Sequence, residues 1–471
     1  MINWFARSLM TKPPLTAYLL ALLFCSPVSA NNSEINKQIN QLENDFKKLS
    51  SEFYQQSSNK TNNNLKSITD IDRLHDLVNK ISGKHPVTAI QLLHFNINTI
   101  KNNLDHKSIF TFIELLLEKN EWQLANSLFT ELKNEGDRSL LATVHFIFAK
   151  YHATRHEWPQ VNKLLKGMLS ELSPEDAAYA YILNGSALQN QKKHRQAIES
   201  YNKVPASSAF YIYAQLNIAI ANIRQGWWTD AQTTINDIIK TTQKDNSDTL
   251  INRLYLVLGY SLLQREYYRD ARDAFRQIGL DNRYTNRALL GIGLTATSQG
   301  DFVGGLNALS ILKDKQTSDL SVDESYLLIP YVYEKLQQEL TVTASYTDAM
   351  NYYQQRIDTL DRISKQHTDF LATQYDRKTS SIIIQNNSLD YGKSYPESFI
   401  NNYQQLTKLA DSTNDKKIKF KIKKLISKHD RTFQNIVDNL LSQRIEYLKS
   451  YLNQSRYGLA RLYDKTNEAA N

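Results

Sequence analysis

The middle of the chain repeats a pattern of small and large apolar residues about every 34 residues, and this feature most limits the fold it can adopt. The clearest copy runs from Leu254 to Phe275, with Gly259 and Ala271 as its small residues. A unit of two short helices cannot bury its apolar face alone, so neighbouring units must stack into a solenoid. The sequence therefore predicts an all-α helical-hairpin solenoid, a type of fold that usually presents a surface to a partner.

A small residue late in each unit, the register residue, aligns the copies. At spacings of 36, 36, 34, 40 and 34 residues, the register residues are Ala125, Val161, Ala197, Ala231, Ala271 and Gly305. Twelve residues earlier lies the helix-A small position, filled by Ala149, Gly185, Ala219, Gly259 and Gly293 but by Ile113 in the first copy. Four residues after the register residue lies the large anchor: Phe129, Leu165, Tyr201, Ile235, Phe275 and Leu309. Six aligned copies predict close helix pairs.

This pattern resembles the tetratricopeptide repeat over roughly residues 105 to 315. The resemblance implies two antiparallel helices per unit, with Gly226 and Gly300 in the tight turns. Departures are the scarcity of proline after the second helix and a longer connection around Lys244 to Asp248. We expect the solenoid over residues 68–315 and degenerate helical repeat over 316–378, with a seventh copy at Tyr346, Ala349 and Tyr353.

Residues 1–30 have the pattern of a secretory signal peptide. Arg7 and Lys12 precede an apolar run that is too short for a comfortable membrane span, and small residues end at Ala30. The alternatives are an uncleaved anchor or acylation at Cys25, where the preceding Phe24 does not fit. We expect export to the periplasm of a Gram-negative bacterium. Cleavage removes the single cysteine and lowers the formal charge from +8 to +6, which does not indicate nucleic-acid binding.

Two heptad patterns flank the repeats. Residues 31–54 are predicted as a heptad helix whose apolar seam is Ile35, Ile39, Leu42, Phe46, Leu49 and Phe53. This helix either forms a coiled coil between chains or folds back as a cap, and an Asn-rich linker is expected over 55–67. A second seam, in a helix predicted from Arg431 to Asp464, consists of Leu441, Ile445, Leu448, Leu452, Ser455, Leu459 and Leu462.

The remaining C-terminal segments are a loop or insertion at 379–396 and C-terminal helices at 397–471. The latter begin with a basic segment, Lys416–Lys428, which has an apolar stripe through it. This segment is either a solvated helix face or a peripheral contact with an anionic membrane or an acidic polymer.

No catalytic or cofactor pattern is present: the sequence has no phosphate-binding GxxxxGK[ST], no GxSxG and no HExxH. His145, His152 and His156 are the best metal candidates, but no further ligand completes a site. We therefore expect no enzyme activity, no cofactor and no metal.

The residue spacing also predicts a partner surface. In repeat solenoids the first helices line the inner face, and counting from the helix-A small position gives Tyr179, Gln189, Tyr213, Arg253, Tyr260 and Arg287 as inward residues. Trp227 is a further, exposed aromatic candidate. This lining suits an extended peptide or a polysaccharide. The hypothesis is a non-enzymatic periplasmic scaffold or adaptor in a cell-envelope complex. The alternative is a polysaccharide-binding or exopolysaccharide-export helper.

Overall fold

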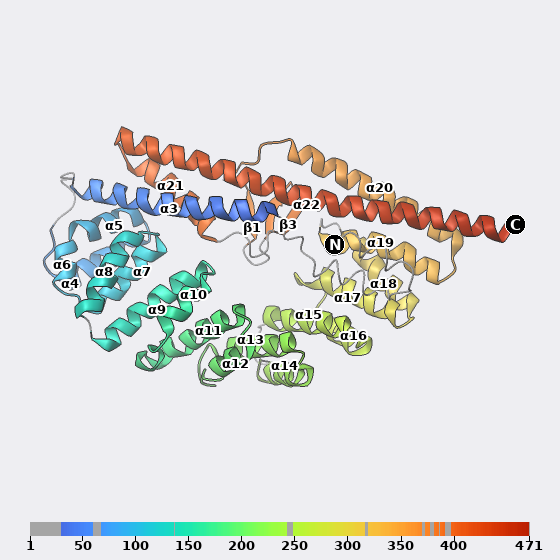
Figure 1. Cartoon of the computed structure of the whole chain (residues 1–471), viewed down its shortest axis with the longest axis horizontal. Helices are drawn as coiled ribbons and strands as arrows, with labels where there is room; N and C mark the ends of the chain where they lie inside the picture. The colour runs from blue at the N-terminus through green and yellow to red at the C-terminus, as the bar shows by residue number, and fades with distance from the viewer. Residues whose placement is uncertain are drawn as a thin grey trace. The chain divides into compact units, whose positions relative to one another are not determined.

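The computed structural model describes residues 30–59, 67–135, 137–242, 248–315, 319–369, 373–376, 381–385, 387–390 and 397–470 (Figure 1). The predicted signal peptide lies outside these residues, apart from Ala30. The chain divides into two compact units. Of the described residues, those within Glu34–Thr234 and Lys393–Phe433 belong to the first unit, and those within Ile235–Gly392 and Gln434–Asn471 belong to the second. Among the described residues, no helix has the length and hydropathy needed to cross a membrane.

Helices build the described part of the first unit. In chain order they are α3 (Ala30–Asn59), α4 (Ile71–Ser82), α5 (Pro86–Phe95), α6 (Ile97–Lys101), α7 (Ser108–Glu118), α8 (Trp122–Glu135), α9 (Arg138–Thr154), α10 (Trp158–Leu165), η1 (Leu169–Glu171), α11 (Pro174–Asn190), α12 (His194–Tyr201), α13 (Tyr211–Gln225), the start of α14 (Trp228–Thr242), α21 (Glu397–Ser412) and the start of α22 (Lys416–Ala470).

The second unit adds three short strands to its helices. It contains the end of α14, α15 (Asp248–Gln264), α16 (Tyr268–Arg276), α17 (Thr285–Ser298), α18 (Phe302–Lys313), α19 (Leu320–Lys335), α20 (Glu339–Ser364), β1 (Gln374–Asp376), β2 (Ser381–Ile384), β3 (Asn387–Asp390) and the rest of α22.

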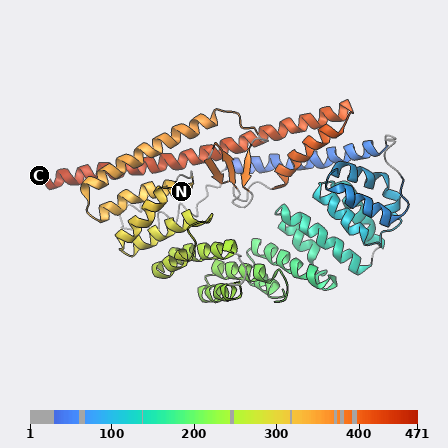
Figure 2. The same ribbon diagram turned by 180° about the vertical axis from the view of Figure 1, so that it is seen from behind.

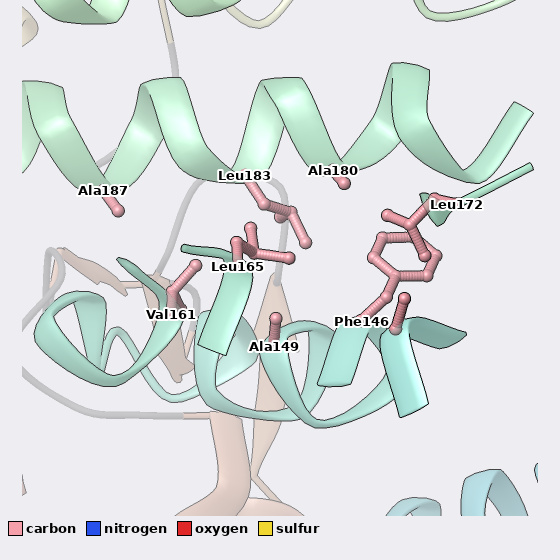
Figure 3. Packing of buried hydrophobic residues seen from close by; sticks show 9 residues of the cluster. Phe146, Ala149, Val161, Leu165, Leu172, Ala180, Leu183 and Ala187 are labelled. Carbon is pink, nitrogen blue, oxygen red and sulfur yellow. The ribbon is translucent and has the colours of Figure 1, made fainter. Parts of the chain in front are cut away.

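The predicted helical-hairpin solenoid is confirmed. Each of the six copies is a pair of consecutive helices, from α7 and α8 to α17 and α18, with the helix-A small position on the first helix and the register residue on the second. In the first unit, the core between α9, α10 and α11 is formed by small and branched residues together with Phe146 (Figure 3). Ala149, Val161 and Leu165 face Ala180 and Leu183 there, which lets neighbouring pairs stack closely.

Glycine at the helix-A small position makes room for the large anchor of the same pair. A Cβ atom built on Gly185 would lie 2.4 Å from the ring of Tyr201, and one on Gly259 would lie 2.6 Å from the ring of Phe275. Phe275 also reaches the next pair, because a Cβ on Gly291 would lie 2.5 Å from the same ring. The anchor ring therefore joins the two helices of one pair and the first helix of the next.

A left-handed residue closes the first helix of every copy, five positions before the register residue. These residues are Asn120, His156, Lys192, Gly226, Glu266 and Gly300. The amide that follows donates a hydrogen bond to the carbonyl five residues earlier, for example from Trp227 to Asn222 at 3.0 Å. The predicted turn glycines are confirmed, and four copies accept a side chain in a conformation that costs about 1 kcal/mol.

A left-handed turn of the same kind shows that the seventh copy has a different register residue from the predicted one. Gln337 has a φ of 58° between α19 and α20, and the amide of Gln338 donates to the carbonyl of Tyr333. The register residue of this pair is therefore Val342, not the predicted Ala349, and its large anchor is Tyr346. The predicted copy was wrong by two helical turns, because α20 is buried at a second row of positions that includes Ala349 and Tyr353.

The N-terminal heptad seam is buried within the chain, as a cap would be. All six predicted seam residues of α3 are buried, and α3 lies antiparallel to the start of α22 (Figures 1 and 2). Lys421 pairs with Glu52 at 2.5 Å and Lys428 pairs with Asp45 at 2.9 Å, so the pairs are seven residues apart on both helices. These part-exposed pairs contribute at most about 1 kcal/mol each, so apolar burial dominates. Helix α3 also includes residues 55–59, which were predicted as linker.

A polar network fixes α3 and α21 to the first repeats of this unit. Glu43 of α3 accepts hydrogen bonds from Arg155 at 3.2 Å and from Asn402 at 2.6 Å. Asn402 also accepts a hydrogen bond from Asn120, the left-handed turn residue, which in turn accepts one from Tyr151 at 3.0 Å. Each buried amide is thereby satisfied by elements far apart in the sequence.

The C-terminal region differs from the prediction in two respects. The basic segment and the second heptad seam belong to one helix, α22, of 55 residues, where a separate helix from Arg431 to Asp464 was expected. In the second unit, Ser455 interrupts the seam without leaving an unpaired hydroxyl, because its buried side chain donates to the carbonyl of Tyr451 at 3.0 Å. The predicted loop or insertion forms an antiparallel meander, in which Ile382 is opposite Leu389 and both are buried. Its first strand, β1, falls within the segment predicted as degenerate repeat.

Two acidic residues are buried where α19, α20 and α22 meet in the second unit. Asp323 pairs with Arg444 of α22 and accepts a hydrogen bond from Tyr352 of α20 at 2.6 Å. Glu324 accepts a hydrogen bond from Tyr451 of α22 at 3.1 Å. Burial raises the pKa of Glu324 to about 7, against the lowering effects of the Tyr451 hydrogen bond and the Arg444 charge.

We expect Gly259→Ala to destabilise the second unit by about 1–3 kcal/mol, although alanine favours helices. The new methyl group would collide with the Phe275 ring, which cannot retreat because Gly291 lies against its other edge. Urea unfolding measures the loss. The matched control is Gly279→Ala, where nothing lies within 4 Å of the added Cβ. Equal stabilities of the two variants would contradict this account of the anchor.

We expect Glu324→Gln to stabilise the second unit at pH 8, by up to ~3 kcal/mol. The folded-state pKa is raised, so the favourable contribution of Glu324 is complete below its ordinary pKa and is lost as the pH rises through about 7. The gain should therefore shrink toward zero at pH 4, as measured by urea unfolding at both values. Glu446→Gln, at an exposed position, is the control. A gain that does not change with pH would refute the assignment.

Candidate partner-binding surface

The predicted inward residues include one repeated position, six residues before the helix-A small position. In four consecutive copies it holds Tyr179, Tyr213, Arg253 and Arg287. In the first unit, Tyr213 at the start of α13 is 48% exposed, so it can contact a partner. Tyr179 on α11 is half-buried, since its ring stacks on Phe210 at 4.9 Å.

Arg253 and Arg287 give the second unit an exposed basic surface. Arg253 lies on α15 and Arg287 on α17, and both are exposed. The guanidinium of Arg287 lies 5.7 Å from the centre of the Tyr260 ring. This contact orients one cation while leaving it accessible, which suits recognition of a carboxylate.

Gln189 and Tyr260 are buried, so a partner could reach neither side chain directly. Gln189 accepts a hydrogen bond from the hydroxyl of Tyr201, the large anchor of its own pair, at 2.9 Å. Tyr260 donates its hydroxyl to the carbonyl of Arg287 at 2.7 Å, and burial raises the pKa of that hydroxyl. Both side chains lie inside the repeat stack, beneath the residues that are exposed.

Trp227 lies directly after the left-handed Gly226 and is half-buried rather than fully exposed. The guanidinium of Arg195 lies 5.3 Å from the centre of its ring. One face of the indole is thus covered by a cation from the preceding pair, and Trp227 stays a predicted contact residue.

The three histidines considered as metal ligands have separate partners. His145 donates from Nδ1 to the carbonyl of Leu164 at 2.9 Å, and His152 pairs with Glu157. His156 adopts a left-handed conformation in the turn between α9 and α10. In the part of the chain that the structure describes, no three His, Cys, Asp or Glu side chains are grouped as a metal site would require.

The basic segment is partly engaged within the first unit. Lys421 and Lys428 pair with α3, whereas Lys416, Lys417, Lys423 and Lys424 are exposed around Phe420, itself 70% exposed. Contact of this segment with a membrane or an acidic polymer stays a prediction.

Sequence reasoning missed a groove of about 720 Å³ formed by α8, α9 and α10. It lies among the first two repeat pairs and is lined by Trp122, Phe129, His145 and Phe148 in particular. The sequence held one signal for it: the first copy has Ile113 where the others have a small residue.

No family model matches the sequence, and no curated protein matches it. Among solved structures, the chain is similar to the apo form of RapI, at 12% identity over 62% of this chain and 92% of that one, with a TM-score of 0.42. It is similar to the apo form of the quorum sensor NprR from B. thuringiensis, at 13% identity over 71% and 98%, with a TM-score of 0.36. The STAND protein PH0952 from Pyrococcus horikoshii, with a tetratricopeptide repeat sensor, gives 14% identity over 91% and 69%, with a TM-score of 0.34. Scores this low carry no conclusion about what this chain binds.

Proposed function

We propose that the chain is a non-enzymatic scaffold that binds a protein or extended peptide through the exposed residues of its first helices. Its setting in this proposal is the periplasm, where it serves as an adaptor in a cell-envelope complex. The observation that carries the proposal is the repeated position at which Tyr213, Arg253 and Arg287 are all exposed.

The chemistry of that position favours a peptide with acidic groups. Tyr213 offers a large ring at low entropic cost, and arginine offers a planar fork of donors for carboxylates. The helices that carry these residues have a buried small residue at the helix-A small position, which is Ala219 in the first unit and Gly259 and Gly293 in the second.

Each unit gives a separate test of the proposal. We expect Tyr213→Ser in the first unit, and Arg253→Ser with Arg287→Ser in the second, each to weaken partner binding about tenfold, the usual cost of losing a central contact residue. A photo-crosslinking amino acid at position 213 or 253 should capture a protein partner in the intact envelope. Position 267, where Tyr267 is also exposed but lies in the turn before α16, is the control site.

Two results would count against this function. Capture that is equally strong at position 267 would show that the first helices are not the binding surface. Binding of purified envelope polysaccharide, lost on the same substitutions, would replace the scaffold by the polysaccharide-binding alternative.

A further inference from the structure

The groove formed by α8, α9 and α10 owes its existence to an irregularity of the first repeat copy. The large anchor is 0% exposed in the other five copies, at Leu165, Tyr201, Ile235, Phe275 and Leu309. In the first copy the anchor Phe129 is only half-buried and lines the groove.

Ile113 gives the physical reason. In the copies with glycine, the anchor lies directly over the helix-A small position, as Leu309 does over Gly293. Ile113 fills that position in the first copy and is itself 0% exposed, so its side chain takes the space that the anchor occupies elsewhere. The ring of Phe129 is left at the surface of the helix pair.

The walls of the groove form a continuous aromatic strip. Phe129 stacks on Phe148 at 4.6 Å, and Phe148 meets the edge of Trp122 at 5.5 Å. His145 extends the strip beside Phe129 at 5.0 Å, and His152 extends it beside Trp122 at 5.6 Å. An apolar concavity of this size matches the sites that hold one or two large side chains of a ligand.

The polar groups of the groove favour a ligand with a negative charge. Lys133 and Lys163 are exposed at its rim and have no ion-pair partner among the described residues. The one carboxylate in the lining, Glu157, is already paired with His152. The two lysine charges are therefore uncompensated.

His145 supplies an unused hydrogen-bonding atom in the wall. Its Nδ1 donates a hydrogen bond to the Leu164 carbonyl, and its Nε2 is buried with no hydrogen-bond partner among the described residues. Burial lowers the pKa of His145, so the ring is neutral and Nε2 is an acceptor for an N–H group. A peptide amide provides such a group, whereas an acyl chain does not.

We propose that this groove binds a peptide segment in which an aromatic or branched apolar side chain stands next to a carboxylate. The apolar side chain lies on Phe129 and Trp122, whose rings pack on the buried ring of Phe148, and the carboxylate meets Lys133 and Lys163. The site lies at residues other than the exposed first-helix residues of the proposed function, and its occupation does not depend on them.

The test is a selection of random dodecapeptides displayed on phage against the purified full chain, followed by fluorescence anisotropy with the selected peptides. The selected sequences should be enriched in aromatic or branched residues adjacent to Asp or Glu. Lys133→Gln with Lys163→Gln should weaken their binding about tenfold or more, without changing the Tm. Lys166→Gln, at an exposed lysine just beyond the end of α10 and outside the lining, should leave binding unchanged.

Ile113→Ala tests the origin of the groove. With the smaller side chain, Phe129 can sink into the helix pair and close the site, so peptide binding should be lost. The Tm should fall less than in Ile109→Ala, a matched change of another fully buried isoleucine on α7. Retained binding in Ile113→Ala would overturn the proposal, since an exposed Phe129 would not be needed.

Further outcomes of these binding experiments also support or overturn the proposal. Failure to select any peptide, or peptides that bind the double lysine variant as well as the unchanged chain, would overturn the proposal. Binding of oleate in place of peptides would show a lipid site instead. Tyr213→Ser should leave the selected peptides bound, so loss of the first-helix partner and loss of this site are separable results.

Discussion

The contact between a large anchor on one helix and a small residue on its neighbour is the interaction on which the repeat array depends. Phe275 makes this contact with two helices, since its ring lies against Gly259 of its own pair and against Gly291 of the next pair. A glycine at such a place costs about 1 kcal/mol of helix stability relative to alanine. Close approach of the helices offsets this cost, because it buries an aromatic ring completely.

This contact explains why so much of the fold could be predicted from sequence. The anchor and the small residue are local in the chain, so Gly185 with Tyr201, or Gly293 with Leu309, are visible as spacings alone. Helix pairs and the glycine turns at Gly226 and Gly300 follow from them. The turns at Lys192 and Glu266 could not be predicted, because backbone hydrogen bonds hold them left-handed whatever the side chain.

The candidate sites were less predictable, for a physical reason. The spacing gives the direction of a side chain but not whether a neighbour covers it, so Tyr213 and Tyr260 were both predicted to face inward, yet Tyr213 is exposed and Tyr260 is buried. The groove at Phe129 arises from a residue on another helix, Ile113. The hydrogen bond between Asn402 and Glu43 joins residues that are 359 positions apart, and no local sequence pattern predicts such a contact.

The antiparallel seam between α3 and the start of α22 has a consequence for the order in which the molecule can form. Helix pairs in the repeats need only neighbours in the chain, so they can form while synthesis continues. Helix α3 emerges among the first segments, yet Asp45 and Lys428 are 383 residues apart. The ion pairs of α3 with α22 therefore cannot form until nearly the whole polypeptide has been made, whereas its contact with the first repeats, through Glu43 and Arg155, can form much earlier. Until α22 has been made, the residues of α3 that face it are exposed, and a chaperone or another copy of the chain can bind them.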